Sequence, residues 1–65
     1  MVYENIRNLR EDHDLTQVHI AHILHISQSS YSKKENGTRE FTASDLIILA
    51  EYYGVSTDYL LSKRH

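Results

Sequence analysis

Residues 15–37, LTQVHIAHILHISQSSYSKKENG, decide the fold that we predict for this chain. Thr16 has a good N-cap side chain, and the apolar residues after it recur at helical spacing, which predicts a helix running to Leu24. A break of three residues follows, and its last residue, Ser27, can cap a second helix over residues 28–36. The stretch therefore predicts two short helices joined by a tight turn.

Two helices joined in this way cross steeply, so the second helix protrudes from the domain. The major groove of B-DNA is wide enough to accept one such helix. Tyr31 is the one large apolar residue in the middle of the second helix, and we expect it to point inward. Gly37 follows the helix at the position where a left-handed residue ends it.

The outward side of this second helix carries short or amide-bearing side chains, namely Gln28, Ser29, Ser32 and Lys33. Glutamine can pair with adenine, serine with several bases, and lysine with guanine or a phosphate. The alternative is a solvated helix face, although such a face would carry more Glu–Lys pairs and fewer serines. Composition alone leaves both interpretations open, and base reading is the sharper hypothesis.

The residues before this pair predict another helix. Tyr3, Ile6 and Leu9 recur at helical spacing and indicate a helix over residues 2–13, ended by the His13–Asp14 pair.

The residues after the pair predict two more helices. Thr42 and Asp45 come close to a capping box and indicate a helix that runs to Tyr53, while Ser56 can cap a last short helix over residues 57–62. The expected inward residues are Leu46, Leu49, Ala50 and Tyr53, with Gly54 closing the longer helix, Tyr59 and Leu60 anchoring the last one, and residues 63–65 forming a frayed tail.

Length and composition agree with an all-α fold. The chain has 65 residues, no Pro and only two Gly, so we expect one compact helical domain over residues 1–65. It has no Cys, which excludes disulfides and thiolate metal sites. We expect a cytoplasmic protein, because no apolar run has the length of a membrane span and the first residues do not resemble a signal peptide.

The formal net charge of −2 argues against a purely electrostatic nucleic-acid binder. A specific binder needs only a local positive surface, and Lys33, Lys34 and Arg39 lie close together in the sequence. Lys34 could instead be half-buried or solvated. We therefore expect weak non-specific affinity and a larger contribution from shape and base contacts.

The sequence resembles the phage-repressor type of helix-turn-helix domain, the Cro and lambda-repressor-like (XRE) family. The resemblance extends from residue 6 to about residue 61. It rests on Ile6, Leu9-Arg10, Leu15-Thr16-Gln17, Ile20-Ala21, Ile26-Ser27-Gln28-Ser29, Ser32, Glu35-Asn36-Gly37, Leu46, Leu49-Ala50, Val55-Ser56 and Asp58-Tyr59-Leu60. The resemblance implies five helices, of which the second and third form the unit that binds double-stranded DNA.

The resemblance also implies roles for individual residues. Gln17 would meet the phosphate backbone beside Thr16 and would brace Gln28, the first residue of the recognition helix. Helix N-termini suit phosphate, because they offer free N–H groups and a positive dipole end. Asn36 and Arg39 would hold phosphates and set register without carrying sequence information. The alternative for Gln17 is a plain polar residue near a cap.

Arg10 and Glu35 are expected to pair across the domain, which is again what the resemblance suggests. His25 departs from the family, which usually has Gly at this turn position with a left-handed backbone. We predict a positive φ at His25 and a cost of about 1–2 kcal/mol, although histidine tolerates this region better than most residues.

The three histidines His19, His22 and His25 are spaced by three and could in principle bind a metal ion. No carboxylate or Cys completes a ligand set at an obvious spacing, so exposed polar side chains are the better interpretation. We expect neither a metal nor a cofactor. Protonation of the histidines at acid pH could strengthen phosphate binding.

Several apolar residues exceed what a single small core needs, and we expect them to form a dimer seam: Ile48, Tyr52, Leu61 and the outward-facing Val18 and Ile23. Family members often bind palindromic operators as two-fold dimers. The alternative is that these residues complete the core against the first helix.

Three classes of function follow. The first is a transcriptional regulator, specifically a repressor that blocks promoter access. The second is an interaction module, because the same fold serves as an antitoxin or as an adaptor for another protein. The third, an enzyme, is disfavoured because the sequence has no evident nucleophile site or acid pair and a small bundle offers little cleft.

Overall fold

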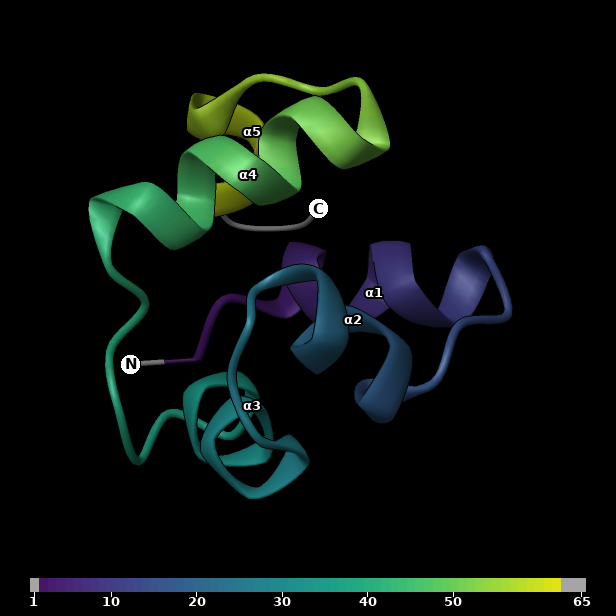
Figure 1. The fold of residues 1–65 in the computed structure, drawn as a ribbon. Helices are drawn as coiled ribbons and strands as arrows, with labels where there is room; N and C mark the ends of the chain where they lie inside the picture. Colours follow the sequence, from purple (N-terminus) through teal and green to yellow (C-terminus); the bar gives the residue numbers. More distant parts are fainter. Residues whose placement is uncertain (1, 63–65) are drawn as a thin grey trace.

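The computed structural model describes residues 2–62, and all of its regular structure is helical. It contains α1 (Glu4–Asp12), α2 (Gln17–Ile23), α3 (Gln28–Glu35), α4 (Ala43–Tyr53) and α5 (Thr57–Leu61). In Figure 1, α4 and α5 lie together at one end of the molecule and α3 lies at the opposite end, with α1 and α2 between them. The predicted all-α, five-helix architecture is confirmed.

Four helices begin at the predicted cap residues. The side-chain oxygens of Thr16, Ser27 and Ser56 each accept a hydrogen bond from the backbone N–H three residues later, which satisfies one of the free donors of the helix start. Thr42 and Asp45 form a full capping box, in which each side chain accepts from the other residue's backbone N–H. Local side-chain chemistry therefore sets these boundaries.

The predicted helix ends differ from the observed ones by one or two residues. The first helix was expected over residues 2–13, but Tyr3 is its N-cap and provides no side-chain hydrogen bond, so the helix begins only at Glu4. The last turns of α2, α3 and α5 each end one residue early, at Ile23, Glu35 and Leu61. The predicted tail at residues 63–65 lies outside the described residues.

Among residues 2–62, four have a left-handed backbone. Gly37 and Gly54 have φ values of 89° and 70°, and Gly54 closes α4 as predicted. His25 has φ 60°, which confirms the prediction made for the turn between α2 and α3. Asp14, between α1 and α2, has φ 55°, a conformation that Asp tolerates better than most side chains.

The core draws on every helix, and Tyr31 is fully buried in it as predicted. The buried apolar residues in the described part of the chain are Ile6, Ile20, Ala21, Leu24, Tyr31, Phe41, Leu49, Ala50 and Leu60. Phe41 lies between α3 and α4, and its ring packs against Tyr31 with centroids 6.2 Å apart. Each large side chain removed from water in this way contributes about 1.5–3 kcal/mol.

Asn5 fastens α5 to the first helix. Its buried side-chain amide donates to the carbonyl of Tyr59 at 2.8 Å and to the carbonyl of Ser62 at 3.1 Å. These carbonyls lie at the end of a five-residue helix, where few intrahelical hydrogen bonds can form. The amide therefore stabilises a helix too short to be stable alone.

The inward and outward assignments need three corrections. Ile23 and Ile48 were expected in surplus on the surface, but both are partly buried and pack against the core. Tyr59 was expected as an anchor, but its side chain is exposed and Leu60 alone is buried there.

In the part of the chain that the structure describes, no helix is long and apolar enough to cross a membrane.

Candidate nucleic-acid interface

The predicted recognition surface lies on α3, whose residues divide between an exposed and a buried side. Gln28, Ser29 and Lys33 are exposed, and Ser32 is half-buried at the edge of their surface. Tyr31, Lys34 and Glu35 are buried on the opposite side. The helix is therefore held by one side while a polar row on the other side stays accessible.

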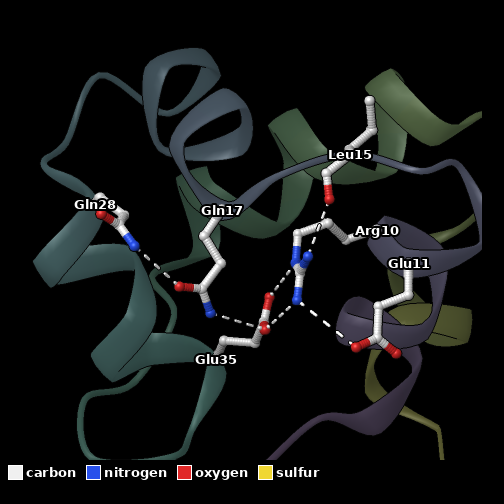
Figure 2. Close-up of polar contacts among 6 residues, drawn as sticks. All are labelled: Arg10, Glu11, Leu15, Gln17, Gln28 and Glu35. Carbon is white, nitrogen blue, oxygen red and sulfur yellow. Dashed lines mark hydrogen bonds and ion pairs between the residues drawn. The ribbon is translucent and has the colours of Figure 1, made fainter.

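Arg10 of α1 and Glu35 of α3 form a two-pronged ion pair (Figure 2). The Nε and Nη2 atoms of Arg10 donate to the two carboxylate oxygens of Glu35 at 2.9 and 2.8 Å. The remaining Nη1 atom of Arg10 donates to the carbonyl of Leu15 at 2.9 Å, just before α2. One guanidinium group thus connects α1, the start of α2 and the end of α3.

This contact shifts the titration of both partners. Burial opposes ionisation of Glu35, but hydrogen bonds from Arg10 and Gln17 outweigh it, so the pKa of Glu35 lies below its usual value. The hydrogen bond to Glu35 in turn raises the pKa of Arg10. Burial raises the pKa of the adjacent Tyr31 hydroxyl well above its ordinary value. The pair therefore stays charged at neutral pH.

A chain of side chains leads from this ion pair to the exposed surface (Figure 2). Gln17 donates from Nε2 to Glu35 at 3.1 Å, and its Oε1 atom accepts from Nε2 of Gln28 at 3.4 Å. Gln17 thus lies between the buried carboxylate and the first residue of α3. Because both ends of the Gln17 amide are hydrogen-bonded, Gln17 orients the Gln28 side chain relative to the buried ion pair.

The other predicted contact residues lie near the ends of α2 and α3. The Thr16 hydroxyl accepts from the His19 N–H at 3.1 Å and is engaged as a cap. Asn36 is exposed, and its Oδ1 atom accepts from the Thr38 N–H at 3.0 Å. Arg39 is exposed in the following loop, whose path is held by a bond from its N–H to the Lys33 carbonyl at 3.0 Å.

Sequence reasoning missed a second ion pair beneath α3. Lys34 was expected to be half-buried or solvated, but its ammonium group is buried and pairs with the carboxylate of Asp45. Burial opposes ionisation of Asp45, yet hydrogen bonds from Lys34 and the Thr42 backbone lower its pKa. The expected positive surface is therefore carried by Lys33 and Arg39, because the charge of Lys34 is neutralised inside the domain.

Of the three histidines near the turn, His19 contacts an aromatic side chain of α4. His19 forms a 3.1 Å hydrogen bond with the Tyr52 hydroxyl, and the two ring centroids are 6.1 Å apart. No cluster of three or more potential metal ligands occurs among residues 2–62. His22 and His25 are exposed.

Comparison with known proteins agrees with this geometry. The sequence model of the helix-turn-helix family matches residues 6–60. The chain is 41% identical over 56 residues to antitoxin PezA of Streptococcus pneumoniae, a match covering 86% of this chain and 35% of that protein. It is 38% identical over 61 residues to the uncharacterized HTH-type transcriptional regulator YobD of Bacillus subtilis, covering 94% of this chain and 54% of the relative.

A third relative is the HTH-type transcriptional regulator PrpR of Mycobacterium tuberculosis, 37% identical over 57 residues that make up 88% of this chain and 12% of that protein. The chain thus spans about half or less of the length of these relatives. No solved structure shows a significant match. The family match takes in well over half of the sequence and includes every helix that carries the interface, and the chain belongs to the XRE-type helix-turn-helix family.

Proposed function

We propose that this chain binds double-stranded DNA in a sequence-specific manner and acts as a cytoplasmic transcriptional repressor. The observation that supports this most is the division of α3, which buries Tyr31, Lys34 and Glu35 while it exposes Gln28, Ser29 and Lys33. A helix anchored in this way can enter the major groove without giving up core contacts.

The proposed contacts fall into two classes. Gln28, Ser29, Ser32 and Lys33 read base edges, and Gln28 is favoured as the main reader because Gln17 orients its amide. The phosphate backbone is contacted by Gln17, Thr16, Asn36 and Arg39. The Thr16 hydroxyl already accepts one hydrogen bond as a helix cap, so it contacts phosphate through its proton or its remaining lone pair.

Two copies of the chain bind a palindromic operator, with half-sites about 34–36 Å apart. Five of the exposed apolar side chains supply a contact surface for the second copy: Val18, Ile47, Tyr52, Tyr59 and Leu61. Repression follows by occlusion, because a dimer on the promoter blocks access to it.

Selection of bound duplexes from a random pool tests the proposal. The expected result is a two-fold symmetric site, recovered at low salt and lost steeply as salt rises. Gln28→Ala should change the preferred sequence, whereas Arg39→Ala should weaken all sequences alike and flatten the salt dependence. Equal effects of the two variants would contradict the division of roles, and failure to retain any duplex in dilute buffer would reject DNA binding.

A second candidate is an antitoxin or an adaptor that uses the same fold to bind another protein. The identity with antitoxin PezA favours it, although the match covers only 35% of that protein. The exposed apolar residues named above offer a surface for a protein partner. Tyr52 lies on that surface, and the repressor proposal predicts that Tyr52→Glu abolishes dimerisation, measured by sedimentation. If Tyr52→Glu still forms dimers on DNA, the surface is not the dimer contact and is available for a different protein.

A further inference from the structure

A hollow of about 300 Å³ opens between α1, α2 and α3, at the edge of the predicted DNA-binding surface. Its walls are formed by Arg7 and Arg10 of α1, Gln17 of α2, and Ser32, Glu35 and Asn36 of α3 and its C-cap. Arg7 is the one member of this set to which neither the sequence nor the proposed function gives a role.

The charge of the hollow is positive. Among the described residues that line it, Glu35 is the only acid, and both of its oxygens accept hydrogen bonds from Arg10, which cancels their charge locally. Arg7 is exposed and has no hydrogen-bond or ion-pair partner within residues 2–62. The two guanidinium groups and the one carboxylate in the walls leave a surplus of one positive charge. Arg10 is paired with Glu35 and also lies 3.9 Å from the exposed Glu11 outside the walls, so the uncompensated charge is that of Arg7.

The hollow also offers an uncommitted neutral donor. The Oδ1 atom of Asn36 accepts from the Thr38 N–H, so the amide N–H groups of Asn36 remain available to donate. A guanidinium group beside a free amide donor, with no uncompensated carboxylate, is a combination that binds phosphate oxygens. The chemistry therefore selects a phosphate group over a cation or an apolar ligand.

The position of the hollow selects the source of that phosphate. A helix in the major groove has a sugar-phosphate strand on each side, and this hollow lies along one flank of α3 between Gln17 and Asn36. We propose that the hollow seats one backbone phosphate of the bound duplex and that Arg7 is the residue that neutralises it. This inference rests on the proposed DNA binding and extends the interface to α1.

The test is the salt dependence of duplex binding by the wild type, Arg7→Gln and Arg7→Lys. Loss of one phosphate contact reduces the slope of log K against log salt by about 0.9, and we expect this change for Arg7→Gln together with a roughly three- to ten-fold loss of affinity near 100 mM salt. Arg7→Lys keeps the charge and should keep the slope, with a smaller loss of affinity. Every duplex sequence should be affected alike.

A charge-matched control separates the contact from the net charge of the domain. Glu51 is exposed on α4 and does not line the hollow. The double variant Arg7→Gln/Glu51→Gln restores the formal net charge of −2, yet its slope should stay as shallow as that of Arg7→Gln. The midpoint of thermal unfolding should be unchanged in Arg7→Gln, because the side chain is exposed and has no partner among the described residues.

The outcomes are distinct. Three results overturn the assignment of Arg7 and leave the proposed function standing, provided that the wild type binds DNA. They are a full slope in Arg7→Gln, a recovered slope in the double variant, and a changed preferred sequence in Arg7→Gln. Competition by inorganic phosphate beyond that of chloride at equal ionic strength overturns the duplex as the source, because the hollow then takes a free anion. A wild type that retains no duplex removes both proposals.

Discussion

Two buried ion pairs hold α3, and they use neighbouring residues of opposite charge. Glu35 pairs with Arg10 of α1, whereas Lys34 pairs with Asp45 of α4. The first pair continues through Gln17 to the exposed Gln28, while the second ends in the cap of α4 at Thr42. The Arg10–Glu35 pair therefore connects the core to the candidate DNA surface, whereas the Lys34–Asp45 pair only holds α3 against α4.

The effect of each ion pair on stability depends less on the strength of the pair than on what is left when one partner is removed. A buried pair adds little net stability, because desolvation offsets most of the attraction, but removing one partner leaves the other charge buried and alone. Lys34 has Asp45 as its one ion-pair partner in the described structure, whereas Glu35 keeps Gln17 as a second donor if Arg10 is removed. The two pairs should consequently respond differently to substitution.

The largest effect is expected for Asp45→Asn. It leaves the ammonium group of Lys34 buried without a counter-charge and should lower the free energy of unfolding by about 3–5 kcal/mol, measured by urea denaturation. Asp58→Asn, an exposed acid in the first turn of α5, serves as the control and should change stability by less than about 0.5 kcal/mol. Similar losses in both variants would mean that the Lys34 pair has no special role.

Arg10→Met should follow with a loss of about 3 kcal/mol, at the low end because Gln17 still donates to Glu35. The variant should also change the preferred DNA sequence, since the support of Gln17 and Gln28 is disturbed. Asp45→Asn, assayed below its unfolding temperature, should keep the wild-type preference. If both variants alter the preference equally, the contrast between the two pairs is wrong.

Acidification should weaken both pairs together. The folded-state pKa values of Glu35 and Asp45 lie below their ordinary values of 4.5 and 3.8, so each group adds stability above those values. That stability is lost as the pH falls through the lower, folded pKa values, because the unfolded chain binds protons first. Unfolding free energy should be flat from neutral pH to about pH 5 and then decline, less steeply in Asp45→Asn than in the wild type.

The smallest effect concerns the turn before α3. His25→Gly relieves a left-handed backbone at φ 60° and should raise the stability by about 1 kcal/mol, or the melting temperature by roughly 4–8 °C. The DNA preference should not change, because the ion pairs and not the turn hold α3. Asp14→Gly, at φ 55°, is the matched control and should gain less; an unchanged melting temperature in His25→Gly would disprove the strain.

The five helices and the starts of four of them could be predicted because they depend on nearby residues. Thr16, Ser27, Thr42 and Ser56 act on N–H groups three residues away, so their spacing alone reveals them. The positive φ at His25 followed from the resemblance, which marks this position as one that usually holds glycine. The pairing of Arg10 with Glu35 also followed from the resemblance.

The missed features depend on contacts between distant parts of the chain. Asn5 bonds to carbonyls 54 and 57 residues away, and Phe41 is buried against the rings of Tyr3 and Tyr31. The partner of Lys34 lies 11 residues further along on another helix, where Asp45 had already been assigned a capping role. Hydrophobic periodicity carries no information on such pairings, because each side chain is polar or lies in a loop.

The burial of Lys34 gives the domain an internal reporter of its own opening. Lys33 and Lys34 are adjacent in sequence, yet Lys33 is exposed and Lys34 as a residue is only 7% exposed. An amine-specific acylating reagent should modify Lys33 at once and Lys34 only in molecules whose α3 has detached from α4. The ratio of the two adducts, read from a single peptide by mass spectrometry, therefore measures how often the recognition helix detaches from α4.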